Sequence, residues 1–133
     1  MAEKIQFELV SPAKLLVSSA VDMVVVPGTE GDFGALPRHS PVIATVRPGV
    51  IDIHDAGKVA DRIFVAGGFA EVNEERITVL AEEAIPVADL TAAMVEERLV
   101  AAKDALDDAR TEAEKVAAEK KIAVANAMKA AAA

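Results

Sequence analysis

The sequence contains no cysteine, tryptophan or tyrosine, and only four of its 133 residues are phenylalanine. The absence of cysteine excludes disulfide bonds, thiolate nucleophiles and cysteine-ligated zinc. The scarcity of aromatic rings argues against a surface that stacks RNA bases. Acidic residues outnumber basic ones by 22 to 14, and the net charge of −8 disfavours contact with a phosphate backbone. We therefore expect an acidic protein without a nucleic-acid partner, long enough to form its own hydrophobic core.

Long apolar runs are also missing. The purely apolar stretches are a few residues long, far short of the roughly 20 residues that a helix needs to span a bilayer. Met1 to Lys4 lead directly into an alternating stretch, without the basic flank and apolar run of a targeting segment. We expect a soluble chain that reaches a membrane only through partner proteins.

Glycine and proline are confined to one part of the chain. All seven glycines and all six prolines lie at or before Pro86, and the segment 87–133 is instead rich in alanine. Glycine and proline mark turns, whereas alanine is the best helix former. The sequence therefore predicts two domains, residues 1–86 and residues 87–133.

The first domain has the pattern of short strands. Hydrophobic residues alternate with other residues at Ile5, Phe7 and Leu9, and again at Val21, Met23 and Val25. Val24 and Val26 make the opposite face of the second segment apolar as well. Further β-rich runs, separated by turn signals, cover residues 42–46, 50–53, 63–66, 69–72 and 77–81. This pattern predicts an antiparallel sandwich or a flattened barrel.

The second domain has the pattern of helices. Asp89 is a candidate N-cap for the first helix. A hinge is predicted at 107–111, and Asp108 within it is a candidate start for a second helix. A single straight helix, or a frayed alanine-rich tail, remains an alternative. The predicted buried stripe is Val95, Leu99, Ala102, Leu106, Ala109, Ala113, Val116, Val124 and Met128. Because this stripe is largely alanine, we expect the helices to dock weakly, by a few kcal/mol, and to be able to occupy two positions.

Residues with catalytic potential are few. His39 lies in a loop rich in glycine and proline, and His54 lies between Asp52 and Asp55 without the serine elbow of a hydrolase. Neither histidine has a recognised metal-ligand spacing. The glycine-rich run 28–34 lacks the Gly-Lys-Ser/Thr of a phosphate-binding loop, and its acidic residues repel phosphate. We expect no catalytic residues, no metal site and no cofactor.

Several segments resemble one family. The run from Pro27 to Val42, PGTEGDFGALPRHSPV, is similar to the signature loop of the epsilon subunits of F-type ATP synthases, called delta in mitochondria. Three further segments match the same family in order, RPGV at 47–50, VAGGFAEV at 65–72 and ITVLAEEA at 77–84. The opening FELVSP at 7–12 also fits. The resemblance implies an α+β fold, a β-sandwich of about ten strands followed by a two-helix hairpin.

The resemblance also implies a function. Members of this family are central-stalk rotor subunits that clamp the gamma subunit to the ring of c subunits and couple proton flow to ATP synthesis. They are not catalytic themselves, and they lie at the cytoplasmic face of the bacterial inner membrane. In many bacterial members the C-terminal helices contact the alpha/beta hexamer transiently and inhibit ATP hydrolysis. A small ligand-binding or enzymatic sandwich with a helical oligomerisation tail is the alternative class; it predicts a deep pocket with convergent polar groups.

Site residues can be carried over by position. The resemblance implies contacts with the c-subunit ring at Glu30, Gly31, Asp32 and His39, and contacts with gamma at Ser11, Ser40 and Thr45. An acidic hairpin is suited to pairing with basic or amide groups on the loops of a ring. The alternative is that the glycines serve turn geometry and the acids only solvate the loop.

The C-terminal segment departs from the family pattern at one site. Some members bind ATP through a motif that resembles Ile/Leu-Asp-x-x-Arg-Ala. In this chain Thr91 stands at the position of the aspartate and Met94 at that of the arginine, so we expect no nucleotide binding there. The resemblance implies inhibitory contacts with the hexamer through the basic residues Arg98, Lys103, Arg110, Lys115, Lys120 and Lys121. The alternative for these side chains is solvation and pairing with acids one helical turn away.

Overall fold

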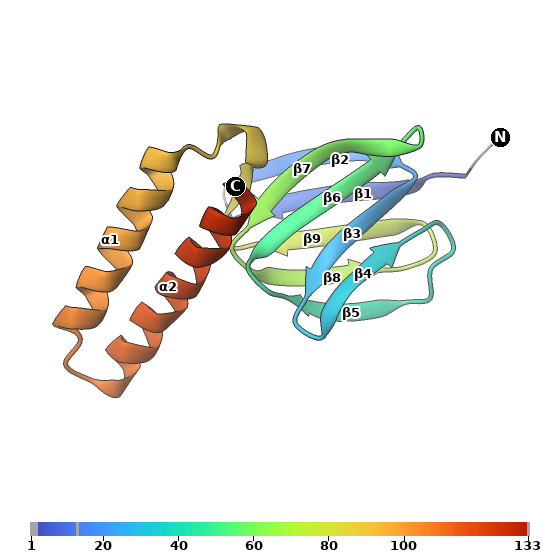
Figure 1. Ribbon diagram of the computed structural model, residues 1–133. Helices are drawn as coiled ribbons and strands as arrows, with labels where there is room; N and C mark the ends of the chain where they lie inside the picture. Colours follow the sequence, from blue (N-terminus) through green and yellow to red (C-terminus); the bar gives the residue numbers. More distant parts are fainter. Residues whose placement is uncertain (1–2, 13, 133) are drawn as a thin grey trace.

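The structure is a computed structural model that describes residues 3–12 and 14–132. Ten short strands are followed by two helices, so the predicted fold class is confirmed (Figure 1). The strands are β1 (Ile5–Ser11), β2 (Lys14–Val21), β3 (Met23–Gly28), β4 (Gly31–Ala35), β5 (Val42–Val46), β6 (Gly49–Asp55), β7 (Lys58–Val65), β8 (Gly68–Val72), β9 (Arg76–Ala81) and β10 (Ala84–Pro86). A 3-10 turn, η1 (Val87–Asp89), leads to the helices α1 (Ala92–Asp108) and α2 (Glu112–Ala132).

The strands form one hydrogen-bonded sheet that folds into two facing layers (Figure 1). One layer contains β10, β7, β6 and β3, with β4 beside β3, and the other contains β5, β8, β9, β1 and β2. The layers are joined where Gly28 of β3 pairs with Val46 of β5. The β1–β9 ladder is parallel, while the other ladders of the described strands are antiparallel. No short hairpin joins β1 to β9, so turn geometry does not impose an antiparallel pairing on them.

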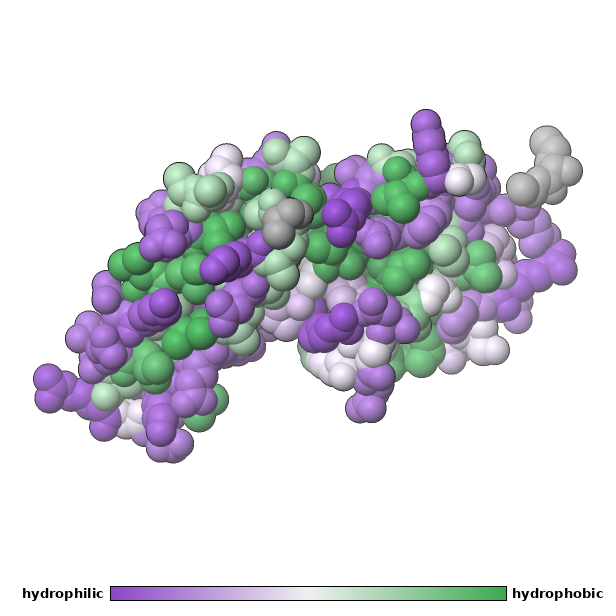
Figure 2. All heavy atoms as spheres, in the orientation of Figure 1, coloured by the Kyte–Doolittle hydropathy of each residue, from purple (hydrophilic) through white to green (hydrophobic). Residues whose placement is uncertain are grey.

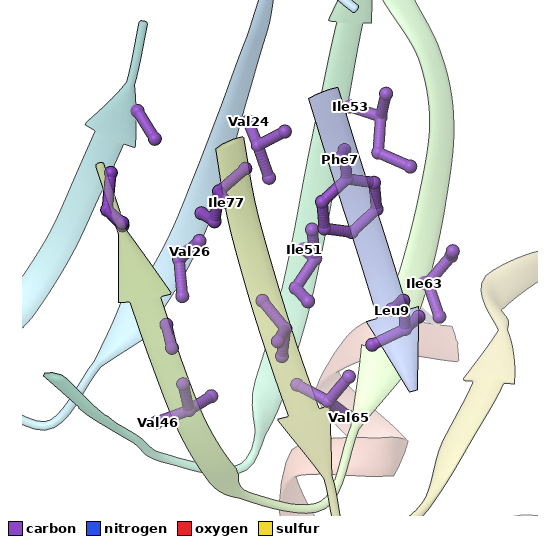
Figure 3. Close-up of a cluster of buried hydrophobic side chains, with 14 of the residues drawn as sticks. Phe7, Leu9, Val24, Val26, Val46, Ile51, Ile53, Ile63, Val65 and Ile77 are labelled. Carbon is purple, nitrogen blue, oxygen red and sulfur yellow. The ribbon is translucent and has the colours of Figure 1, made fainter. Parts of the chain in front are cut away.

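Inward-facing side chains of both layers form the main core. The alternation predicted for β1 is confirmed, since Ile5, Phe7 and Leu9 are all fully buried. Figure 3 shows Phe7 and Leu9 from one layer and Ile51 and Ile63 from the other directed into the same space. The stripe predicted through Val21, Met23 and Val25 is wrong beyond its first residue, because Val24 and Val26 are buried whereas Met23 and Val25 are only half-buried. The bend at Asp22 shifts the alternation by one residue.

Threonines cap both helices. The hydroxyl of Thr91 accepts a hydrogen bond from the backbone N–H of Met94 at 3.1 Å, so the prediction of Asp89 as the cap is wrong. Asp89 instead ends the 3-10 turn. The predicted hinge is present, but α1 ends at Asp108 and Thr111 caps α2 through the backbone N–H of Glu114 at 3.1 Å. The Glu114 carboxylate accepts a hydrogen bond from the Thr111 hydroxyl at 3.3 Å, which strengthens the cap.

The hinge changes which residues of α2 are buried. The predicted stripe holds in α1, where Val95, Leu99 and Ala102 are buried. It is wrong at Ala113, which is exposed, and at Val116, which is 57% exposed. The predicted spacing applies to one continuous helix. Three non-helical residues separate α1 from α2, so the face of α2 that is buried is not the continuation of the buried face of α1. In α2 the buried residues are Ala118, Ala125, Met128 and Ala131.

The hairpin packs against the sandwich at its base. Phe64 points outward from β7 and joins a second hydrophobic cluster with Val95, Leu99 and Met128. Phe64 and Met128 are both fully buried. The rest of the hairpin projects away from the sheet, with the two helices packed on each other (Figure 1). Docking therefore depends on two large side chains, which contribute about 1.5–3 kcal/mol each, more than on the alanine stripe.

The hydrogen bond that caps α2 at Thr111 is expected to contribute to stability. We expect Thr111→Ala to lower the free energy of unfolding by about 1 kcal/mol, because the N–H of Glu114 loses its acceptor. Urea unfolding followed by circular dichroism measures this change. Thr111→Ser retains the hydroxyl and is the matched control, with a loss of only a few tenths of a kcal/mol expected. Equal losses in the two variants would show that the hydroxyl does not stabilise the helix.

Candidate functional site

An apolar row crosses the outer face of the layer that contains β5, β8, β9, β1 and β2. Strand register aligns the row, since Phe69 pairs with Leu80 and Leu80 pairs with Val10. Val10 pairs in turn with Leu15 at one end, and Phe69 pairs with Thr45 at the other. Leu15, Phe69 and Leu80 are 55%, 57% and 54% exposed. We call these five residues, Leu15, Val10, Leu80, Phe69 and Thr45, the apolar row.

Of the three residues predicted to contact gamma, one lies beside this row and one belongs to it. Ser11 lines a shallow groove with Phe69 and Leu80. Thr45, on β5, is the last member of the row and pairs with Phe69 of β8. Ser40 is exposed in the loop before β5 and is not part of the row; its carbonyl oxygen lies 2.7 Å from Nδ1 of His39. The structure thus brings Ser11 and Thr45 to one surface, whereas Ser40 is not part of it.

The four residues predicted to contact the c-subunit ring line one shallow hollow. Glu30, Gly31 and Asp32 lie at the tip of the β3–β4 hairpin, and His39 approaches from the loop that follows β4. The hollow has a volume of about 580 Å³ and is also lined by Thr45 and Ile43. Ile43 is 75% exposed, so this end of the sandwich presents acidic and apolar groups together. We call residues 28–32 the acidic hairpin.

Arg47 ties the acidic hairpin to the rest of the sheet. Its guanidinium bonds to the carboxylate of Asp32 and to the carbonyl oxygen of Gly28. In the sequence, Arg47 belongs to the family segment 47–50, and nothing nearby indicates its partner. An acid and a base 15 positions apart do not signal a pair unless the strand register is known.

Two adjacent carboxylates of the β9–β10 turn hold one helix each. Glu83 accepts two hydrogen bonds from Arg98 of α1, one of them at 3.0 Å, and Glu82 lies 3.5 Å from the ammonium of Lys120 of α2. Hydrogen bonding to Glu83 raises the pKa of Arg98, so the guanidinium stays charged. These groups line a pocket of about 570 Å³ between the helices and the sandwich. Lys121 lines the same pocket. Arg98 is therefore engaged within the chain while the hairpin is docked.

The other predicted basic residues lie toward the far end of the hairpin. Lys103, Arg110 and Lys115 are all exposed, and Arg110 and Lys115 line one hollow beside the hinge. Figure 2 shows hydrophilic side chains spread over this face of the hairpin, with hydrophobic patches between them. These three side chains are accessible to a partner.

The two positions that depart from the nucleotide-binding motif contact each other. Thr91 caps α1 through the N–H of Met94, so its hydroxyl serves the helix start.

Within residues 3–12 and 14–132, no three His, Asp or Glu side chains are close enough to share a metal ion. The same part of the chain contains no helix that is both long enough and apolar enough to cross a membrane.

The apolar row could be found only in part from the sequence. Phe69 and Leu80 each alternate with buried neighbours, which places them on the solvent side of their strands. Their alignment with Val10, however, depends on a ladder between the first and ninth strands.

Residues 4–87 match the family model described as ATP synthase, Delta/Epsilon chain, beta-sandwich domain. The ATP synthase epsilon chain of Paramagnetospirillum magneticum is 74% identical over 131 residues, which cover 98% of each chain. The ATP synthase epsilon chain of Rhodospirillum rubrum is 60% identical over the same length and also covers 98% of each chain.

Two solved structures share the fold. A chain of the Tetrahymena thermophila mitochondrial ATP synthase central stalk and c-ring superposes with a TM-score of 0.75 at 15% identity, covering 98% of both chains. A chain of the Euglena gracilis mitochondrial ATP synthase OSCP/F1/c-ring structure gives a TM-score of 0.79 at 23% identity, covering 96% of this chain and 81% of the other. At these identities the likeness concerns the fold alone.

Proposed function

The chain belongs to the ATP synthase delta/epsilon family, and we propose that it is a non-catalytic central-stalk rotor subunit that clamps gamma to the c-subunit ring. In this role it transmits the rotation that couples proton flow to ATP synthesis. Residues 1–86 form the clamp, and residues 87–133 form an arm that reaches the alpha/beta hexamer. The chain is then a peripheral component at the cytoplasmic face of the bacterial inner membrane, held there by its partners.

The apolar row is the observation that carries the proposal. Three large apolar side chains, Leu15, Phe69 and Leu80, are more than half exposed on one sheet face. Rows of exposed apolar groups with a polar surround mark protein interaction sites. The groove along the row is shallow, which suits a broad contact with a protein surface better than a small molecule. This supports gamma as the partner of this face.

The acidic hairpin supports the second contact. It lies beside Ile43 and Thr45, at the end of β5 that adjoins the apolar row. A partner on the row and a partner at the hairpin tip are therefore held close together by one rigid sheet. This arrangement fits a bracket between gamma and the polar loops of the ring.

Reconstitution tests the proposed function. The chain is added to an ATP synthase complex purified without it, and ATP-driven proton pumping into vesicles is compared with ATP hydrolysis. We expect the chain to bind through gamma and to raise the ratio of pumping to hydrolysis. A chain that neither binds gamma nor changes this ratio would refute the proposal.

The exposed basic residues of the hairpin make a separate prediction. We expect the triple variant Lys103→Gln, Arg110→Gln and Lys115→Gln to raise ATP hydrolysis by the assembled complex, since an inhibitory arm then loses its charges for acidic surfaces of the hexamer. Lys58→Gln, an exposed lysine of the β6–β7 hairpin, is the control and leaves hydrolysis unchanged. Unchanged hydrolysis in the triple variant would argue against inhibition through these side chains.

The alternative class, an enzymatic or ligand-binding sandwich with an oligomerisation tail, is not favoured. Within the described residues no polar or charged side chain is buried, so the pocket walls lack the convergent buried polar groups that such a site uses.

A further inference from the structure

Two turns of the sandwich are fastened to each other where the sandwich meets the helical hairpin. The N–H of Ala66, in the β7–β8 turn, donates to the carbonyl oxygen of Glu83 at 2.9 Å. The N–H of Glu82, in the β9–β10 turn, donates to the carbonyl oxygen of Gly67 at 2.9 Å. We call these four residues and Gly68 the turn pair. Since each turn donates to the other, neither can shift without breaking a hydrogen bond.

Glycine gives the turn pair its shape. Gly67 has a φ of 126° and Gly68 a φ of 143°, which are conformations that other residues rarely adopt. A Cβ atom at Gly68 would collide with the carbonyl oxygen of Leu80, so β8 and β9 approach each other here more closely than a side chain permits. Two consecutive glycines have many conformations to lose, so fixing this geometry costs conformational entropy.

One side of the turn pair leads into the apolar row. Gly68 pairs with Ala81, and the next pair on the same ladder is Phe69 with Leu80, two members of the row. Glu82 lines the shallow groove along the row together with these side chains. A partner seated on the row therefore rests on the strand ends that enter the turn pair.

The other side of the turn pair holds the hairpin. Glu83 accepts a hydrogen bond from Arg98 of α1 at each of its two carboxylate oxygens, through Oε1 at 3.0 Å and through Oε2. Glu82 lies 3.5 Å from the ammonium of Lys120 of α2. Ala66 is buried in the hydrophobic cluster on which the hairpin docks. Because the fork of an arginine requires both carboxylate oxygens in one position, docking needs the turn pair in this same geometry.

We propose that binding of gamma to the apolar row and docking of the hairpin are positively coupled through the turn pair, so that bound gamma holds the hairpin on the sandwich. The inference rests on the proposed function, in which gamma covers the row. Both events select the same geometry of the turn pair, so whichever occurs first lowers the cost of the second. Release of the arm toward the hexamer then has to overcome the gamma contact as well as the docking contacts.

Linkage supplies the test, because the coupling factor has to be the same in both directions. Amide exchange at the base of α1 and α2 in the full-length chain measures opening of the hairpin, with and without purified gamma. We expect gamma to slow this exchange roughly fivefold, a coupling of ordinary size. Met128→Asp places a carboxylate in the docking cluster, and we expect it to bind gamma roughly fivefold more weakly in titration calorimetry. Asn126→Asp adds the same charge at an exposed position of α2 and should retain full affinity.

Glu83→Gln separates coupling through the turn pair from a direct contact between gamma and the hairpin. Glu83 faces Arg98, whereas the acid of the turn pair that lines the groove along the row is Glu82. The glutamine keeps the size of the side chain and replaces one acceptor oxygen by a donor. We expect it to weaken gamma binding roughly threefold, and gamma to slow exchange in this variant less than about twofold. Glu119→Gln removes a carboxylate from an exposed position of α2 and should leave both signals unchanged.

The outcomes distinguish the inference from the proposed function. If gamma slowed exchange equally in Glu83→Gln and in the unaltered chain, gamma would contact the hairpin directly, and coupling through the turn pair would be overturned. If gamma bound Met128→Asp with full affinity and did not slow exchange in the unaltered chain, the two events would be independent, and only the inference would fall. If the unaltered chain did not bind gamma, the proposed function would fail and the inference with it.

Discussion

Phe69→Asp is expected to weaken binding to gamma by roughly a hundredfold or more, the loss that follows from removing an aromatic anchor worth a few kcal/mol. The phenylalanine is 57% exposed and lies in the apolar row between Leu80 and Thr45. A carboxylate in its place has to be desolvated when the partner covers the row. Titration calorimetry with the purified chain and purified gamma measures the affinity.

Loss of folding is excluded by a matched control. Because Phe69 faces solvent, we expect the variant to lose no more than about 1 kcal/mol of folding stability, mainly from its cross-strand pairing with Leu80. Val59→Asp makes a similar change at an exposed apolar residue of β7, outside the row, and should leave the affinity unchanged. Equal effects of the two substitutions on binding, or normal binding by Phe69→Asp, would remove the row from the interface.

The sandwich could be predicted because its signals are local. Alternation in β1 specifies which face of that strand is buried, and the ends of most strands follow from nearby glycine and proline residues. The hinge itself follows from local signals, but the start of α2 predicted at Asp108 does not. Asp108 is a poor helix-interior residue and a possible cap, whereas Thr111 and Glu114 form the Thr-x-x-Glu pattern of a capping box. Propensity gives a weak preference, and hydrogen bonding at the threonine decides where α2 begins.

The surfaces could not be predicted because they depend on register between distant strands. The alternation of β9 places Leu80 on the solvent side, but nothing near it in sequence places Val10 beside it. The same limit applies to Arg47, whose side chain bonds to a hairpin that precedes it by a whole loop. Family resemblance identified the acidic hairpin, yet only the geometry distinguishes a paired Asp32 from an exposed Glu30.

Helix docking shows the same limit. The predicted alanine stripe holds only in part, since Ala102 is buried whereas Ala113 is exposed. The docking surface on the sandwich is instead centred on Phe64, an outward-facing residue of a strand whose neighbours Ile63 and Val65 face the main core. A continuous apolar run such as 63–65 is the signature of a strand that is covered on both faces.

Met128→Asp is expected to release the hairpin from the sandwich. Met128 is fully buried and packs in the same cluster as Phe64. An unpaired carboxylate costs several kcal/mol to bury, which is comparable to the whole gain from docking, so the base of the hairpin leaves the sheet. The sandwich remains folded, because its main core is a separate cluster that contains no helix residue.

Two measurements on the purified chain detect the release. The sequence has no cysteine, so spin labels at two introduced cysteines, one at Val59 and one at the exposed hinge residue Arg110, report a single distance between sandwich and hinge. We expect the distribution of this distance to broaden in Met128→Asp. Amide exchange at the base of α2 should accelerate by roughly a hundredfold, as a loss of about 3 kcal/mol of docking free energy implies. Asn126→Asp adds the same charge at an exposed position of α2 and should preserve both signals. A sharp, unchanged distance in Met128→Asp would show that the ion pairs of Glu82 and Glu83 hold the hairpin without the hydrophobic cluster.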